Sequence, residues 1–199
     1  MGSLSYFNLN DYVNQYNLNG FLETGLGHGH GIQYATTCNF EICYSIEISK
    51  EVIQRYHRMY GNNSKINIIQ GTSKFGLQHV FEHDSNKQYL IFLDAHFPAA
   101  DLGFAGFNDE KNDSLKYPLL DELKIIKSRA DKGYKDVIIV DDLMFYSNEI
   151  FPDSHIKSYF KIEPPKDNNC LDKIMSYFDK THKAELVKQF SGFGIFTPN

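Results

Sequence analysis

The chain alternates between short apolar runs and amphipathic stretches. Uninterrupted apolar or β-branched runs predict strands at residues 21–24, 42–46, 66–70, 89–93 and 137–140. Apolar positions at helical spacing, with Ser49 as one N-cap, predict helices at residues 32–37, 50–60, 73–81, 118–130 and 171–178. Two runs around Ser191-Gly192 predict a hairpin over residues 185–197. The alternation is typical of an α/β fold, in which helices cover both faces of a mostly parallel sheet.

A length of 199 residues suits one domain, and no linker-like segment divides the chain. We therefore predict a single domain over residues 1–199. The longest stretch without a predicted element is residues 98–117, which contains Gly103, Gly106 and a charged run. Loops of this length in a compact domain are usually functional or mobile. Residues 98–117 are therefore either a lid over an acceptor or a tolerated surface insertion.

Composition excludes several classes of protein. No apolar run approaches the ~18 residues of a membrane span, and the first residues lack the regions of a secretory signal. Three cysteines are too few for a disulfide framework, so we expect a reducing, cytoplasmic location. With a net charge of −5 and no basic cluster, the chain is a poor candidate for binding nucleic acid. We expect no membrane partner and leave a homodimer open.

A glycine-rich turn follows the first predicted strand, with the sequence Glu23-Thr24-Gly25-Leu26-Gly27-His28-Gly29-His30-Gly31. In an open α/β sheet this position lies at the carboxyl ends of the strands, where cofactors bind. Glycine lets the backbone turn tightly and lets a ligand approach it. The dinucleotide pattern G-x-G-x-x-G fails in all three registers, because its last position holds His30, Ile32 or Tyr34. The alternative is a turn that only connects a strand to a helix.

The remaining pattern, acid-x-Gly-x-Gly-x-Gly led by Glu23, resembles the nucleotide-binding signature of class I S-adenosylmethionine-dependent methyltransferases. The resemblance implies a Rossmann-like, seven-stranded sheet of order 3-2-1-4-5-7-6 with an antiparallel last strand. It also implies that Glu23 holds the methionine end of S-adenosylmethionine, in a turn shaped by Gly25, Gly27 and Gly29. A carboxylate here would repel a pyrophosphate but not the aminium group of S-adenosylmethionine.

An acid at the end of the second predicted strand supports the same cofactor. Glu47 follows Gly27 by about twenty residues, a spacing at which a carboxylate accepts both hydroxyls of a ribose. The apolar Ile48 can pack on the adenine. The turn Gly71-Thr72-Ser73 resembles the family's Gly-Asp-Ser turn, with Thr72 in place of the Asp that contacts the adenine. We predict that Glu47, Ile48, Thr72 and Ser73 bind the cofactor.

Polar residues also follow the fourth and fifth predicted strands, namely Asp94, His96, Asp141 and Asp142. Parallel strands share their carboxyl ends, so these groups are expected to converge. In one mechanism His96 is the general base that removes a hydroxyl proton, and Asp94 orients it or contacts the cofactor. In the other, Asp94, Asp141 and Asp142 hold a divalent cation such as Mg²⁺ that aligns the acceptor oxygens. Adjacent strand residues point to opposite faces, so both aspartates coordinate only if the strand has ended.

Three segments together resemble a bacterial group of small methyltransferase-like proteins over about residues 21–146. They are LDAHF at 93–97, PLLDELK at 118–124 and VIIVDD at 137–142. This resemblance implies O-methylation of a sugar or another small hydroxylated molecule. The alternatives are a catalytically silent binding module with the same fold and another nucleotide-cofactor enzyme, such as a dehydrogenase.

Other polar residues are expected to have ordinary positions. His28 and His30 lie on a glycine turn without a neighbouring cysteine, and we expect them to face solvent. Glu122, in the helix that follows Pro118, is expected at the surface, and the alternative is a position that caps the active-site side. The three cysteines lack the spacing of a zinc site and are expected to be buried as small apolar residues.

Overall fold

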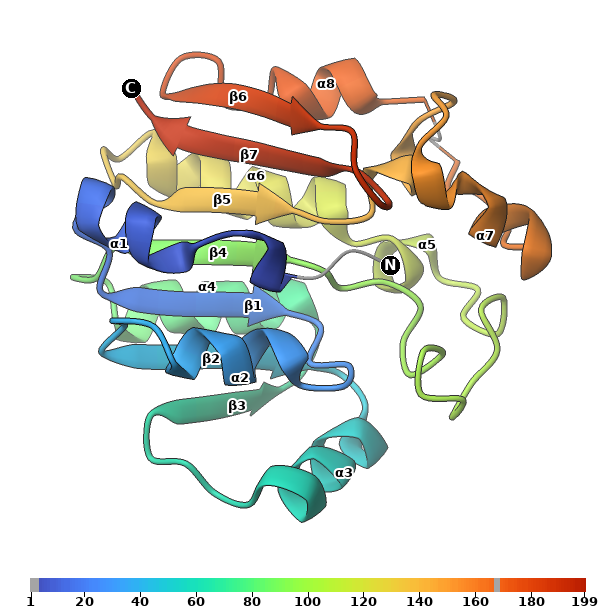
Figure 1. The fold of residues 1–199 in the computed structure, drawn as a ribbon, viewed down its shortest axis with the longest axis horizontal. Helices are drawn as coiled ribbons and strands as arrows, with labels where there is room; N and C mark the ends of the chain where they lie inside the picture. Colours follow the sequence, from blue (N-terminus) through green and yellow to red (C-terminus); the bar gives the residue numbers. More distant parts are fainter. Residues whose placement is uncertain (1–3, 167–168) are drawn as a thin grey trace.

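The computed structural model describes residues 4–166 and 169–199. Its centre is a seven-stranded sheet of order β3-β2-β1-β4-β5-β7-β6 (Figure 1). The strands are β1 (Gly20–Thr24), β2 (Ile42–Glu47), β3 (Ile66–Gln70), β4 (Tyr89–Leu93), β5 (Val137–Val140), β6 (His182–Val187) and β7 (Phe193–Pro198). Strands β1 to β5 are parallel, and β7 runs antiparallel to both β5 and β6. The predicted fold class and strand order are confirmed.

Helices cover both faces of this sheet (Figure 1). Apolar residues of α1 (Leu9–Tyr16), α2 (His30–Thr36) and α3 (Lys50–Tyr60) pack into one buried cluster. Those of α4 (Ser73–His83), α6 (Leu119–Ala130) and α8 (Leu171–Met175) pack into the other. Short helices complete the chain, namely α5 (Asp113–Lys116), α7 (His155–Tyr159) and the 3₁₀ turns η1 (Leu4–Tyr6), η2 (Leu143–Tyr146) and η3 (Pro152–Ser154). Among the described residues, no helix has the length and apolar character that crossing a membrane requires.

Most of the predicted elements form at or near the predicted positions. Strands β3, β4 and β5 have the predicted bounds, and the Ser49 hydroxyl caps α3 by accepting a hydrogen bond from the Val52 amide at 3.3 Å. Helix α1 was not predicted, because its only buried apolar residues are Leu9 and Val13. The segment 98–117 is not wholly irregular, since it contains α5. Helix α8 ends at Met175 rather than at residue 178, and β6 begins at residue 182 rather than 185.

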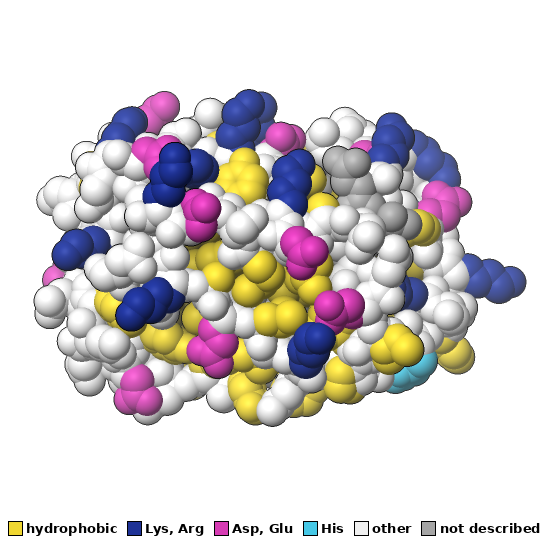
Figure 2. Space-filling view, turned by 90° about the horizontal axis from the view of Figure 1, so that it is seen from above, with side chains coloured by type: hydrophobic (Ala, Val, Ile, Leu, Met, Phe, Trp, Pro, Cys, Tyr) yellow, Lys and Arg dark blue, Asp and Glu magenta, His cyan; other side chains and the backbone are white. Residues whose placement is uncertain are grey.

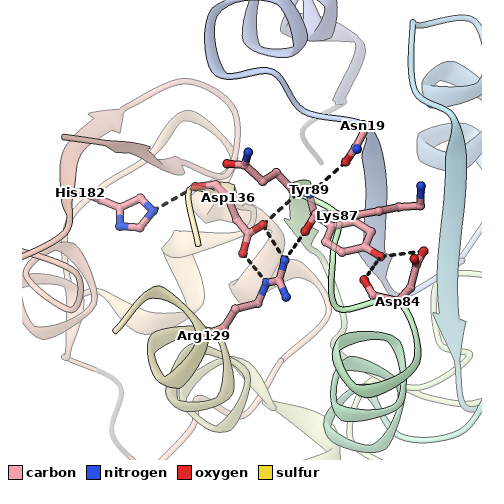
Figure 3. Close-up of polar contacts among 8 residues, drawn as sticks. Asn19, Asp84, Lys87, Tyr89, Arg129, Asp136 and His182 are labelled. Carbon is pink, nitrogen blue, oxygen red and sulfur yellow. Dashed lines mark hydrogen bonds and ion pairs between the residues drawn. The ribbon is translucent and has the colours of Figure 1, made fainter. Parts of the chain in front are cut away.

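A buried polar network fixes the amino ends of the central strands (Figure 3). The carboxylate of Asp136 accepts hydrogen bonds from Arg129 Nε at 2.6 Å and from the Tyr89 amide at 2.8 Å. The Asp136 carbonyl lies 2.9 Å from His182 Nε2, which explains the early start of β6. Arg129 also lies over the Tyr134 ring. The network joins α6 to β4, β5 and β6 and leaves the opposite, carboxyl ends of the strands for other contacts.

Strand β3 is one of the two edge strands of the sheet, and β6 is the other. Lysine and acidic side chains surround an apolar area on the face that includes this edge (Figure 2). On the strand itself, Lys183 and Glu185 are exposed. Charged side chains on an edge strand discourage pairing with another sheet.

Candidate functional site

A cavity of about 540 Å³ lies at the carboxyl ends of β1, β2, β4 and β5. Nearly all of the residues predicted to act on a cofactor, a cation or an acceptor line it. They are Glu23, Gly25, Gly27, Glu47, Ile48, Thr72, Ser73, Asp94, His96, Asp141 and Asp142. Gly29 does not line the cavity: it has a φ of +80° before α2, and a side chain there would meet the Tyr56 ring.

The glycine turn brings the ends of β1 and β4 into contact. Gly25 has a φ of +84°, and a Cβ at this position would lie 2.7 Å from the Asp94 carbonyl oxygen. Only glycine tolerates both the backbone conformation and the close approach. Gly27 has a φ of +48°, and a Cβ there would meet nothing within 4 Å. At Gly27 the backbone is therefore open to a ligand in the cavity.

The Glu47 carboxylate is held at the end of β2 by backbone amides. Its Oε2 accepts from the Leu26 amide at 3.1 Å, and its Oε1 accepts from the Ser49 amide at 2.8 Å. Burial raises the pKa of Glu47, and these amides oppose the rise. The amides of Gly27 and Ile48 also act on this carboxylate and lower its pKa, and the residue lines the cavity.

Glu23 lies deeper, with 1% of its surface exposed. Its Oε1 accepts a hydrogen bond from the Ser45 hydroxyl at 2.7 Å, and Gly31 of α2 leaves room for its other oxygen. Burial raises the pKa of Glu23 to about 8, against the Ser45 hydrogen bond and with a contribution from the charge of Glu47. A cation bound beside Glu23 would restore its charged form at neutral pH.

The turn after β3 forms the next wall. The Thr72 hydroxyl is the N-cap of α4 and accepts from the Phe75 amide at 3.2 Å. This contact uses one acceptor site of the hydroxyl and explains why a threonine suits the position as well as an aspartate. His28 and His30 are exposed, as predicted, and their rings stack 5.5 Å apart at the rim of the cavity.

An Asp–His–Asp group stands on the other side of the cavity. His96 Nε2 lies 2.7 Å from Asp142 Oδ2, and His96 Nδ1 lies 3.0 Å from the Asp94 carbonyl oxygen and 3.6 Å from Asp94 Oδ1. Burial alone would lower the pKa of His96, but Asp142 and then Asp94 outweigh it and raise the pKa to about 10. Burial and the neighbouring Asp141 raise the pKa of Asp94. His96 is thus an imidazolium with both ring nitrogens engaged.

Asp141 does not join this group, in contrast to the predicted cation site. Strand β5 ends at Val140, and Asp142 has a φ of +56°, so the two aspartates point in different directions. Asp141 Oδ1 accepts from the Ser191 hydroxyl at 3.0 Å and from the Asp142 amide at 2.6 Å. Burial and the charge of Asp142 raise the pKa of Asp141 to about 8. Through these contacts Asp141 links Ser191 to the backbone that follows β5.

The group that fits a cation is Asp94, His96 and Asp142. One ligand atom from each lies within 4.8 Å of the others. Two carboxylates and an imidazole are donors that divalent cations accept. Asp142 Oδ1 is buried and has no hydrogen-bond partner, so a further positive group at this point would satisfy it.

The segment 98–117 walls the rest of the cavity, through Pro98, Ala99, Asp101, Leu102, Ser114 and Leu115. Its entry is strained, because Phe97 and Ala99 have φ values of +44° and +62°. Phe97 is held there by edge-on contacts with the rings of His96, Phe107, Tyr117 and Phe145.

Several contacts tie this segment to the chain before α8. The Tyr117 hydroxyl donates to the Glu163 carbonyl, Lys116 Nζ lies 3.9 Å from Glu163 Oε2, and the Asn108 amide makes three further hydrogen bonds. Asn108 Nδ2 donates to the Lys161 carbonyl at 2.9 Å. Asn108 Oδ1 accepts from the Glu163 amide at 3.0 Å and from Lys116 Nζ at 2.9 Å. The rings of Phe107 and Phe160 lie 4.7 Å apart beside it.

Two acids near the cavity were missed or misplaced by sequence analysis. Glu122 is 1% exposed rather than on the surface, because it shares the inner face of α6 with Leu119, Leu123 and Ile126. Burial raises the pKa of Glu122 to about 7, which the hydroxyls of Ser73 and Thr24 partly oppose. Asp101 lines the cavity and has a buried Oδ1 without a hydrogen-bond partner. No sequence signal distinguishes it within its segment.

No family model matches the chain, and no curated protein matches it in sequence. Solved methyltransferase structures nevertheless resemble it. One is a provisionally assigned caffeoyl-CoA O-methyltransferase from Staphylococcus aureus, with 16% identity and a TM-score of 0.59 over 100% of this chain and 85% of that one. The O-methyltransferase TomG from Streptomyces achromogenes, solved with S-adenosylmethionine, has 13% identity and a TM-score of 0.57 over 96% and 78%. An O-methyltransferase from Bacillus cereus in complex with SAH has 14% identity and a TM-score of 0.54 over 96% and 79%. At these identities the likeness establishes a shared fold.

Proposed function

We propose that this chain is an S-adenosylmethionine-dependent methyltransferase of the small bacterial type, acting on a hydroxyl of a sugar or another small molecule. The observation that carries the proposal is a single cavity that combines residues suited to a cofactor with residues suited to a cation and an acceptor. One end has the glycine turn and Glu47, and the other has the group of Asp94, His96 and Asp142. Two of the O-methyltransferases with this fold were solved with S-adenosylmethionine or SAH, which supports the cofactor.

The residues present suit this cofactor. The Glu47 carboxylate lines the cavity as an acceptor for the ribose hydroxyls, and Ile48 beside it offers an apolar surface for the adenine. The open backbone at Gly27 admits the ligand. Glu23 lines the cavity, and the positively charged methionine end beside it would lower its pKa and restore the carboxylate. S-adenosylmethionine, when bound, supplies an electrophilic methyl group.

On the acceptor side, we favour a cation mechanism over His96 acting alone. A general base must have an available nitrogen, whereas both nitrogens of His96 have partners and the ring is protonated at neutral pH. Asp94, His96 and Asp142 would hold the cation, which would lower the pKa of the acceptor hydroxyl. Residues 98–117 are the proposed lid over the acceptor. The three cysteines are free and buried, which supports a reducing location such as the cytoplasm.

The first test is calorimetric titration of the protein with S-adenosylhomocysteine, with and without Mg²⁺. We expect Glu47→Gln to weaken binding at least about tenfold, because a neutral amide offers one acceptor oxygen instead of two. Glu82→Gln removes the same charge from an exposed site on α4 and should bind like the parent chain. Absence of binding by the parent chain would sink the proposal, and NAD would then be titrated in its place.

A further inference from the structure

The acceptor end of the cavity is acidic beyond the group that fits a cation. Segment 98–121 contributes two charged residues to the lining, Asp101 and Asp121. Among the described lining residues the only lysine or arginine is Lys74, which follows Ser73 at the cofactor end. A cavity lined by one sign of charge concentrates ligands of the opposite sign.

Asp101 has an oxygen that nothing in the described protein satisfies. Its Oδ1 is buried without a hydrogen-bond partner. Lys116, whose ammonium group lies over the Phe97 ring, donates to Asn108 instead. Leaving a buried carboxylate oxygen without a donor is costly, so the position is suited to a ligand that donates hydrogen bonds.

The backbone around Asp101 is built to hold it over the cavity. The Ala100 amide donates to the Phe97 carbonyl at 2.9 Å, and the Phe104 amide donates to the Ala99 carbonyl at 3.1 Å. These bonds close a compact turn over residues 97–104. The turn includes the two strained positions, Phe97 and Ala99, which is the kind of strain found at ligand-binding sites.

Asp101 is not one of the three residues that fit a cation, Asp94, His96 and Asp142, although its charge helps to raise the pKa of both Asp94 and His96. Asp142 is 4% exposed, and its unpartnered Oδ1 belongs to the same cavity wall. A divalent ion on those three residues would compensate their charge and leave Asp101 and Asp121 negative. An additional positive group on the acceptor would therefore complete the site.

We infer that the acceptor carries a protonated amine near the hydroxyl that is methylated, as an amino sugar does, and that Asp101 binds this amine. An ammonium group supplies both the charge and up to three hydrogen-bond donors. A carboxylate- or phosphate-bearing acceptor would meet two uncompensated acids. The inference rests on the proposed function, since it names the acceptor class for that same site.

The test compares three sugars that share one ring and differ in charge: glucosamine, glucose and glucuronate. Each is titrated by ligand-observed NMR onto protein saturated with S-adenosylhomocysteine and Mg²⁺. We expect glucosamine to bind at least about tenfold more tightly than glucose, and glucuronate more weakly than both. Asp101→Asn should abolish the preference for glucosamine over glucose. Asp179→Asn, which removes an exposed acid far along the chain, should retain the preference.

Three results would overturn the inference: glucosamine that binds no better than glucose, glucuronate that binds as well as glucosamine, or a preference that survives in Asp101→Asn. The initial titration with S-adenosylhomocysteine separates the two proposals. If that titration fails, the methyltransferase proposal fails. If it succeeds and the sugars show no charge preference, only the inference about the acceptor is wrong.

Discussion

His96 Nε2 lies 2.7 Å from Asp142 Oδ2, and this contact joins the residues that follow β4 and β5. The side chains are 9% and 5% exposed, so water screens the pair poorly. The sequence suggested His96 as a general base. In the structure Asp142 and Asp94 raise its pKa, so that the ring is protonated and pairs with these two acids. A cation bound by His96 must therefore displace the proton that this ring shares with Asp142.

The first prediction is that His96 stays protonated at neutral pH in the protein without cofactor or cation. Burial acts against this, but Asp142 and Asp94 raise the pKa of His96 to about 10. The pKa of an unfolded histidine is about 6.5, so this contribution to stability is fully present below about pH 6.5 and is lost as the pH rises through about 10. A pH titration of the ring nitrogens by NMR measures it. Asp142→Asn should lower the pKa of His96 by more than about one unit.

The second prediction concerns cation binding. Because a cation requires a neutral imidazole, binding of Mg²⁺ or Mn²⁺ should release about one proton from His96. Calorimetry in buffers with different ionisation enthalpies counts the protons released. Asp142→Asn should abolish binding, whereas Asp141→Asn should retain it, since Asp141 contacts Ser191 instead of the group. Equal losses in the two variants would contradict the assigned ligands.

The third prediction uses the buried carboxyl of Glu122. Burial raises its pKa from 4.5 to about 7, so the protonated form stabilises the fold fully below about pH 4.5, and this contribution is lost as the pH rises through about 7. Glu122→Gln should remove this dependence and, near pH 8, increase the free energy of unfolding by up to roughly 3 kcal/mol relative to the parent chain. Urea unfolding across this pH range provides the measurement. A parallel pH profile in both proteins would refute the shifted pKa.

The fourth prediction tests the network at the amino ends of the strands. Arg129→Met leaves the Asp136 carboxylate buried without its cation and should cost about 3–5 kcal/mol of unfolding free energy. Adding Asp136→Asn should recover part of the loss, because the uncompensated charge is then removed. The control is Lys127→Met, which breaks the exposed pair of Lys127 and Asp131 and should change stability by less than about 1 kcal/mol. Chemical denaturation would contradict the prediction if Arg129→Met matched this control.

The sequence was sufficient to predict the strands of the sheet, but it did not predict the direction in which every acidic side chain points. Strand β4 consists of five buried apolar residues, and a continuous apolar run of this length is typical of a buried parallel strand. Helix α1 carries two buried apolar residues in a polar segment, too few for a periodic signal. Asp141 and Asp142 differ in role because of a positive φ at Asp142, which tertiary contacts impose. Glu122 was misplaced because only the packing of α6 decides whether it or Asp121 faces inward.

The attachment of segment 98–117 through Asn108 has a consequence for how this chain could change its selectivity. Lys161 and Glu163 meet Asn108 through backbone groups alone, so substitution of their side chains leaves these two hydrogen bonds in place. Any insertion or deletion there moves those backbone groups and, through Asn108 and Tyr117, the wall that carries Asp101. Changes of length at residues 161–163 can therefore alter the shape of the acceptor end of the cavity without any substitution among the residues that touch the ligand.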